Sequence, residues 1–237
     1  MGVNMANPRL NDLLATLPES DLQFLLPSLQ LVSLTAGETL VEAGSQTTKI
    51  YFPINAVVAH SREMSDGLAI DTASVGCDGM LGLGGLTGSP LHRLYVSQSG
   101  LAYRMDIGRL VLAMESYPKI SEMCMKGVQH ILRKISIELA CSHFHSIHQR
   151  VARWILAQDD YSQDGSINVT HQAIAHSLGV RREAVSLALH KLSGCSVSRS
   201  HLEIADRIAL ENESCGCYFQ LRAINPKQIQ LPFGDSL

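Results

Sequence analysis

Two short helices with a sharp turn between them are predicted by residues 170–192, THQAIAHSLGVRREAVSLALHKL. Ala175 is small enough for a second helix to pack closely over it. Gly179 follows the residue at which the first helix should end, and only glycine takes a positive φ there without steric cost. Val185 then begins an apolar stripe at helical spacing, so the second helix has a buried side.

The front of this second helix is polar, in contrast to its buried side. The same spacing of Ala175, Gly179 and Val185 also occurs in an ordinary αα-hairpin inside a protein core. A buried hairpin, however, would not carry an Arg-Arg-Glu triplet. In a helix that enters the DNA major groove, the N-terminal side chains reach the base edges. We therefore predict that the helix reads DNA bases with Arg181, Arg182, Glu183 and Ser186.

The composition is that of a globular chain with no overall basic surface. The 237 residues allow one large domain or two modest ones, and 46% are hydrophobic. Aromatic residues make up only 5%, which argues against a base-stacking platform. The net charge is −3, and residues 145–207 hold seven Lys or Arg against six Asp or Glu. Basic side chains must therefore cluster in space if they are to meet phosphates.

Nothing in the chain resembles a targeting or membrane segment. The N-terminus has no apolar run of signal-peptide length, and no window approaches ~18 consecutive apolar residues. The six cysteines are scattered, unlike those of a secreted disulfide framework. The simplest interpretation is a reduced, cytoplasmic protein without membrane contact.

The pattern of apolar residues changes near Asp106 from one typical of strands to one typical of helices. Residues 10–26 read as short helical turns. From Leu29 to Met105, β-branched or alternating runs separated by glycines predict an antiparallel sandwich or barrel. A short helix is predicted over Ile107–Met114, and a long helix follows from about residue 120 to the region of residue 145.

The long helix carries an apolar stripe that recurs every three to four residues: Ile120, Cys124, Val128, Ile131, Ile135 and Leu139. Four charged residues lie off it: Lys126, Arg133, Lys134 and Glu138. A narrow stripe of this length favours a parallel helix pair between two chains. The alternative is that the stripe packs on the β-domain of the same chain. Both arrangements hold together if one edge of the helix faces the β-domain and the other edge faces the second chain.

Two short alternating segments, Cys195–Val197 and Leu202–Ile204, follow the helix pair and indicate a small β-hairpin wing. A further helix precedes the pair, beginning after a break at residues 142–148. The order of these elements predicts a winged-helix domain.

Six segments together resemble the Crp/Fnr-type bacterial transcription regulators, and the resemblance covers Leu10 to Tyr218. The segments are TAGETLVEAG at 35–44, YFPINAVV at 51–58, VGCDGMLGL at 75–83, HSIHQRVARWIL at 145–156, SLGVRREAV at 177–185 and EIADR…ESCGCY at 203–218. Each is weak alone, but their order and spacing are specific.

The resemblance implies an α+β chain with an N-terminal antiparallel, jelly-roll-like β-roll, a long dimerisation helix and a C-terminal winged helix-turn-helix. We place the effector domain at 10–116, the dimerisation helix at 117–144, the DNA-binding domain at 145–218 and a tail at 219–237. The implied function is transcription regulation by a homodimer on palindromic, double-stranded promoter DNA, with RNA polymerase as a further partner.

The resemblance also assigns roles within the DNA-binding domain. Arg182 and Glu183 match a base-reading pair, in which Arg bonds guanine and Glu accepts from cytosine. Leu187 stands where a second base-reading Arg is common, so the operator should differ from the familiar half-site. In the wing, Ser200 replaces the usual glycine. Thr170, which also fits a helix N-cap, heads the set expected at phosphates. That set is Thr170, Gln172, His190, Lys191 and Arg199.

The effector segment departs from the cyclic-nucleotide pattern. Relatives that bind these nucleotides hold the ribose with a Glu and the phosphate with an Arg-Ser/Thr pair. When the pattern is aligned on Gly82, Leu83 takes the Glu position, Arg93 keeps the Arg position and Leu94 replaces the Ser/Thr. We expect no binding of cAMP or cGMP, and we predict no cofactor. Arg93 is then either a surface residue or a contact for another anionic effector.

Cys141, His145 and His148 stand at i, i+4 and i+7 and could present Zn²⁺ or haem-iron ligands on one helix face. A buried cysteine with two polar histidines at a hinge is the alternative that we favour. Cys215 and Cys217 are too close to chelate a metal by themselves and lack a visible second pair. We interpret them as a C-terminal packing element, with thiol oxidation as the alternative.

The sequence argues against two further functional classes and leaves a third open. The chain has no Walker loop, GxSxG, HExxH or dinucleotide-binding fingerprint, so we predict that it is not an enzyme. No cysteine precedes Cys77, which argues against the N-terminal iron–sulfur cluster of some relatives. Leu187 and the altered wing leave one alternative: a small-molecule, metal or redox sensor whose main output is not DNA binding.

Overall fold

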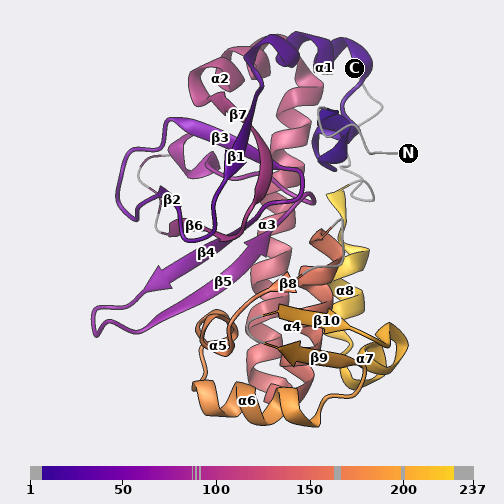
Figure 1. Ribbon diagram of the computed structural model, residues 1–237. Helices are drawn as coiled ribbons and strands as arrows, with labels where there is room; N and C mark the ends of the chain where they lie inside the picture. Colours follow the sequence, from indigo (N-terminus) through magenta and orange to yellow (C-terminus); the bar gives the residue numbers. More distant parts are fainter. Residues whose placement is uncertain are drawn as a thin grey trace. The chain divides into compact units, whose positions relative to one another are not determined.

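The computed structural model describes residues 7–86, 88, 90, 92–162, 167–198 and 201–226. Contacts divide the chain into two units, and Figure 1 follows its elements in sequence order. The first unit holds the described residues up to Ala59, residues 75–133 and those from Ala223 onward. The second holds residues 60–74 and 134–222.

Short helical turns open the first unit, as the sequence predicts. They are the 3-10 turns η1 (Pro8–Leu10), η2 (Leu14–Thr16) and η3 (Leu26–Ser28) and the helix α1 (Glu19–Leu25). Asn11 is fully buried, and its amide donates to the carbonyls of Pro53 and Gly79. Its carbonyl oxygen accepts from the backbone N–H of Leu13 and Leu14, so every polar atom of this side chain is satisfied.

Seven antiparallel strands form the β-roll that we expected. One sheet has the order β1-β7-β3 and the other β2-β6-β4-β5. The strands are β1 (Gln30–Leu34), β2 (Thr39–Val41), β3 (Lys49–Pro53), β4 (Val57–Glu63), β5 (Ala69–Val75), β6 (Arg93–Gln98) and β7 (Gly100–Asp106). Every strand supplies a buried apolar residue to one cluster, among them Leu34, Val58 and Val96. The two sheets therefore enclose a common core.

A second cluster of the first unit lies under the helices. It joins Leu13 and Leu22 to Ile50 and Phe52 of β3, and to Leu110 of α2 (Ile107–Ser116). η4 (Leu83–Leu86) packs at its edge through Leu83.

Helix α3 (Pro118–Phe144) matches the predicted long helix, but its apolar stripe is divided. Ile120 and Cys124 are buried in the first unit's core, whereas Val128 and Leu139 are 37% and 61% exposed. Lys134, which we placed off the stripe, is buried. Part of the stripe therefore packs in the core of the first unit, as one of the two alternatives expects, and part of it is exposed.

The second unit has the predicted winged helix-turn-helix (Figure 1). Its elements are α4 (Ile147–Tyr161), β8 (Ile167–Asn168), α5 (His171–Leu178), α6 (Arg182–Lys191), β9 (Cys195–Ser198), β10 (His201–Ile204), α7 (Arg207–Glu213) and α8 (Cys217–Ala223). The wing has three strands in the order β8-β10-β9. The sequence pattern missed β8, because a strand of two residues is too short to show alternation.

Side chains of the second unit's helices and wing share one apolar core. Val151 and Ile155 of α4 are fully buried in it, together with Ile174, Val185 and Leu202. Since α5, α6 and α7 all pack on α4, this helix is the scaffold of the domain. No helix in the described part of the chain has the length and apolar character needed to cross a membrane.

Candidate nucleic-acid interface

The turn between α5 and α6 is built as the sequence predicts. Thr170 caps α5, its hydroxyl oxygen accepting from the backbone N–H of Ala173 at 3.1 Å. Gly179 ends the helix at φ 63°, and its N–H donates to the carbonyls of Ala175 and His176. A left-handed residue at this place closes the helix and redirects the chain, so it fixes the direction in which α6 starts.

Helix α6 has one buried side and one exposed side. Val185, Ala188 and Leu189 are buried in the core of the second unit. The three side chains at the start of the helix, Arg181, Arg182 and Glu183, are all exposed. Leu187 is 64% exposed on the same open side, so an apolar side chain interrupts the polar surface.

Ser186 differs from the other base-reading candidates. It is half-buried, its hydroxyl donates to the Arg182 carbonyl at 3.1 Å, and it lies 2.9 Å from Nδ1 of His171. The hydroxyl is thus engaged inside the domain. A base contact by Ser186 would need these hydrogen bonds to be shared or exchanged.

The expected phosphate contacts lie at the two ends of the helix pair. Thr170 and Gln172 are exposed at the start of α5, and His190 and Lys191 are exposed at the end of α6. Arg199 lies outside the described residues, as does Ser200 in the wing. Their assignments stay predictions.

Three of the seven basic residues counted in this region hold the domain together. Arg150 donates to the Leu178 carbonyl at 2.7 Å and so caps the C-terminus of α5. Arg153 and Arg207 bind carboxylates of the same unit. The sequence count overstated the free positive charge, because it could not separate these internal arginines from those at the surface.

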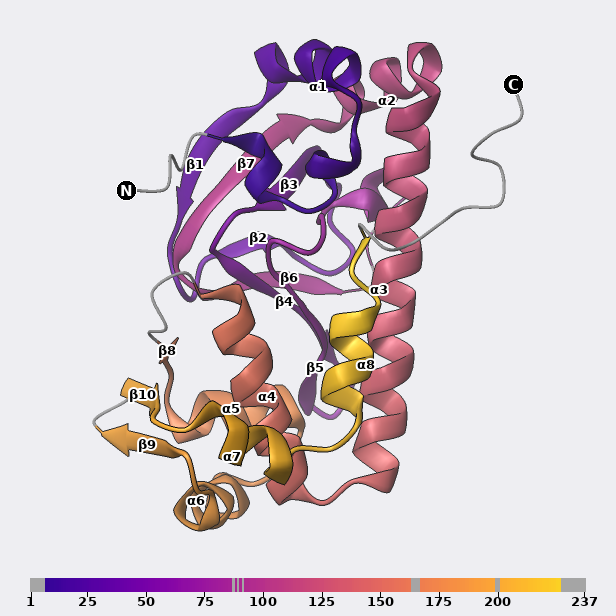
Figure 2. The same cartoon turned by 90° about the vertical axis from the view of Figure 1, so that its right-hand side faces the viewer.

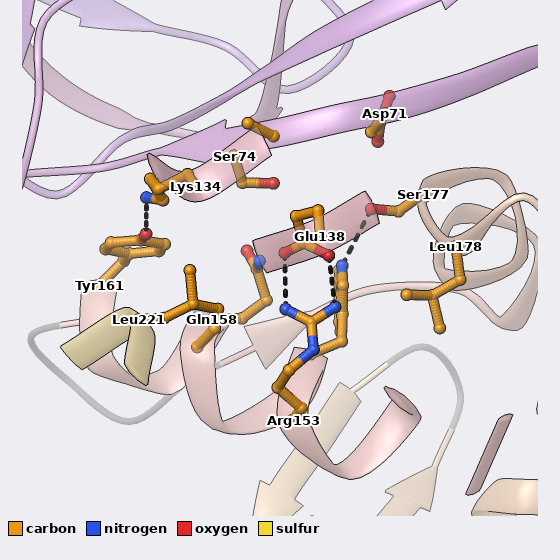
Figure 3. A pocket seen from close by; sticks show the side chains of 13 residues that line it. Asp71, Ser74, Lys134, Glu138, Arg153, Gln158, Tyr161, Ser177, Leu178 and Leu221 are labelled. Atoms are coloured by element: carbon orange, nitrogen blue, oxygen red, sulfur yellow. Dashed lines mark hydrogen bonds and ion pairs between the residues drawn. The ribbon is translucent and has the colours of Figure 1, made fainter. Parts of the chain in front are cut away.

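A buried ion pair fixes α4 against the end of α3 (Figure 3). The Arg153 guanidinium donates to both oxygens of Glu138, at 2.5 and 2.6 Å. The Arg153 side chain is 2% exposed and that of Glu138 28%. Beside this pair, Trp154 donates to the Ser177 hydroxyl at 3.0 Å, and Lys134 bonds the Tyr161 hydroxyl. Polar links thus connect α4 both to α3 and to α5.

The effector segment in the first unit begins at Gly82, where the backbone leaves no space for a side chain. Gly82 has φ 95°, and a Cβ atom would lie 2.2 Å from the Lys49 carbonyl oxygen. The next residue, Leu83, packs against the apolar core. A carboxylate at the position of Leu83 would therefore face apolar side chains.

Arg93 and Leu94 lie on opposite faces of β6. Arg93 is exposed, donates to the Thr39 hydroxyl at 2.8 and 3.1 Å, and stacks 5.4 Å from the ring centre of Tyr95. Leu94 is buried in the core between the sheets. Arg93 is thus a surface residue whose partners lie on its own sheet. The next residue, Leu94, offers it no polar group.

The candidate metal ligands separate into two places. Cys141 and His145 lie together, but with Cys215 and Cys217 in place of His148. Nε2 of His148 instead lies 3.0 Å from a carboxylate oxygen of Glu213. The grouping of His148 with the other two is therefore wrong. The view that the C-terminal cysteines lack a second pair of ligands is also wrong, because packing supplies one.

The comparisons with known proteins agree with this geometry. Residues 149–213 match the family model of the Crp-like helix-turn-helix domain. This segment is therefore a Crp-like helix-turn-helix domain. No curated protein matches the sequence significantly.

Solved structures show the same fold at low sequence identity. FixK2 from Bradyrhizobium japonicum has a TM-score of 0.68 and 17% identity, over 79% of this chain and 98% of that one. CLP from Xanthomonas campestris, described as a c-di-GMP-responsive global regulator, scores 0.64 at 14% identity over 80% and 100%. A putative cAMP-binding regulatory protein from Silicibacter pomeroyi scores 0.58 at 22% identity over 88% and 96%. The shared fold confirms the fold class that we predicted.

The end of the Crp-like domain is held by Arg207. Its guanidinium binds Asp159 and Asp160 at the end of α4, Glu211 one turn along α7 and the Tyr218 hydroxyl. Burial and the Asp160 carboxylate raise the pKa of Tyr218 to about 12, so the phenol stays protonated at neutral pH. The network ties α7 and α8 to the scaffold helix.

We predict that Glu138→Gln lowers the free energy of unfolding of the second unit by about 3 kcal/mol, because Arg153 then stays buried without a counter-charge. Urea unfolding followed by the fluorescence of Trp154, the chain's single tryptophan, measures the change. Glu211→Gln is the matched control, since its partner Arg207 is 34% exposed and keeps two aspartates. It should cost less than about 1 kcal/mol. Equal losses in the two variants would contradict the role given to Glu138.

Proposed function

We propose that the chain is a homodimeric transcription regulator that binds palindromic promoter DNA sequence-specifically and has no enzymatic activity. One observation carries the proposal: the exposed Arg181-Arg182-Glu183 triplet at the start of α6, on the buried frame of a Crp-like domain. Helix N-terminal residues in this position reach base edges when the helix lies in the major groove.

Arg182 and Glu183 supply the sequence readout. An arginine can donate two hydrogen bonds to guanine, and a glutamate accepts from cytosine. Leu187, exposed one turn further along, has no hydrogen-bonding group and favours contact with a thymine methyl. The operator should therefore combine a G·C pair near the start of α6 with an A·T pair opposite Leu187.

A stripe of exposed apolar residues on α3 supports dimerisation with a second copy of the chain. Met125, Leu132 and Leu139 are each about 60% exposed, and Val128 is 37% exposed. With Ile135, these residues follow a repeat of three and four residues along the helix. This is the spacing of a coiled-coil seam, in which two helices bury each other's stripes.

A two-fold symmetric dimer sets the form of the DNA site. Each chain offers one α6, so the operator should consist of two inverted half-sites about one helical turn, or 10 base pairs, apart. Thr170, Gln172, His190, Lys191 and Arg199 would contact phosphates, and RNA polymerase would meet the promoter-bound dimer.

The effector is proposed to be something other than cAMP. The ribose-binding carboxylate is replaced by Leu83, which packs on the core, and the hydroxyl beside Arg93 is replaced by the buried Leu94. Each lost hydrogen bond to a charged group removes roughly 1.5–3 kcal/mol of binding free energy. The similar structures are described with different ligands, c-di-GMP in one and cAMP in another, so the fold leaves the effector open.

The sensor without DNA-binding output is not favoured. The two observations that suggested this alternative were Leu187 in place of an arginine and Ser200 in place of the usual wing glycine. An exposed Leu187 changes which base pair is preferred, while Arg181, Arg182 and Lys191 stay accessible on the same domain. The match of residues 149–213 to the Crp-like helix-turn-helix family also favours DNA binding.

Arg182→Ala should relax the preference at one base pair of the half-site and cost about 1–3 kcal/mol of binding to the best operator. Lys191→Ala is the comparison: it should weaken all sequences alike and lower the salt slope of log K by about 1. Fluorescence anisotropy on a set of single-base operator variants separates the two effects. An unchanged preference in Arg182→Ala would refute the readout role of this residue.

Leu132→Glu should convert the dimer to a monomer, because it places a charge at the centre of the α3 seam. Sedimentation velocity measures the mass, and DNA affinity should fall with it. Leu112→Glu is the control, since Leu112 is 55% exposed on α2, outside the stripe. A Leu132→Glu variant that remains dimeric would show that α3 is not the interface.

Neither cAMP nor cGMP should raise the Tm of the purified chain, because two of the three polar contacts are absent. Differential scanning fluorimetry at increasing nucleotide concentration tests this. A saturable rise in Tm at micromolar nucleotide would contradict the expectation.

A further inference from the structure

Four potential metal ligands converge in the second unit: Cys141, His145, Cys215 and Cys217. Their ligand atoms all lie within 4.8 Å of one another. Sγ of Cys141 is 3.5 Å from Sγ of Cys215, and Sγ of Cys217 is 3.5 Å from Nδ1 of His145. The three cysteines are buried and the histidine is half-buried. None of these residues belongs to the DNA-reading surface.

Two separate segments supply the ligands. Cys141 lies in the last turn of α3, and the backbone N–H of His145 donates to its carbonyl at 3.1 Å, so the two side chains share one face. Cys215 and Cys217 flank Gly216, and Cys217 is the first residue of α8. Figure 2 shows α8 next to α3, and the contact between Cys141 and Cys215 brings the two pairs together.

We propose that these four residues form a closed, tetrahedral Cys₃His site for one Zn²⁺ ion. Zinc binds thiolates at about 2.3 Å and imidazole nitrogen at about 2.0–2.1 Å, so ligand atoms around it stand about 3.5–3.8 Å apart. Two of the pairs, Cys141 with Cys215 and Cys217 with His145, already have about this separation. The widest pair needs to close by about 1 Å, which side-chain rotation supplies.

The arrangement fits a single zinc ion better than the other species that use such ligands. Four protein ligands leave no open position, unlike a haem iron or a catalytic zinc. An iron–sulfur cluster places sulfides between the irons and holds its ligands further apart. A disulfide between Cys141 and Cys215 would join two of the four groups and leave Cys217 and His145 without a role.

The surroundings suit a negatively charged metal centre. A zinc ion with three thiolates carries a net charge of −1, and Arg153 lies nearby. The positive charge of Arg153 acts on Cys141, Cys215 and Cys217. A bound cation would hold all three sulfurs as thiolates.

The role of the ion would be structural. It would connect the end of α3 to the segment that leads into α8, next to the Glu138–Arg153 pair. Since a site of this kind forms only in the folded state, zinc binding would add to the stability of the second unit.

Metal analysis of the full-length chain, purified under reducing conditions from zinc-supplemented cells, tests the proposal. The wild type should contain one zinc per chain, and Cys217→Ser and His145→Ala should lose it. Cys195→Ser and His148→Ala are matched controls outside the cluster and should retain it. Circular dichroism establishes that each variant is folded.

Cobalt substitution of the wild type gives a second result that does not depend on any variant. Co²⁺ added to the metal-free chain should produce thiolate charge-transfer absorption and the strong visible bands of a tetrahedral centre, and Zn²⁺ should abolish both. A wild type that neither retains zinc nor binds cobalt in this way would overturn the proposal. Zinc retained equally in Cys217→Ser and His145→Ala would overturn it as well.

Discussion

The buried ion pair between Arg153 and Glu138 is the constraint on which the DNA-binding half of the molecule depends. A guanidinium that is 2% exposed is tolerated only because both oxygens of one carboxylate meet it. The pair fixes α4 on α3. Since α5 and α6 pack on α4, the pair holds the scaffold on which both helices lie, and Gly179 sets the turn between them. Arg150 and Trp154 extend the same control to the end of α5.

The same unit separates its arginines by role. Arg150, Arg153 and Arg207 bind groups inside the domain, and Arg181 and Arg182 are exposed at the start of α6. A chain with a net charge of −3 can therefore present a local positive surface without a basic composition. The arrangement favours sequence readout over general attraction to phosphate, because few cations remain to bind the backbone.

Local rules made much of the fold predictable. The positive φ of Gly179, the Thr170 cap and the buried side of α6 each follow from neighbouring residues, and the structure confirms them. Contacts distant in sequence were not predictable in this way. Burial of Lys134 and convergence of Cys141 with Cys215 depend on how helices pack, which periodicity does not encode. The base and phosphate assignments stay predictions.

Selection of bound fragments from random double-stranded DNA by the wild-type chain tests the central claim most directly. The sequences that survive should share an inverted repeat with half-sites about one helical turn apart. Each half should carry the G·C pair expected for Arg182. Recovery of fragments without a common motif, or with a single unrepeated half-site, would contradict a symmetric, sequence-reading dimer.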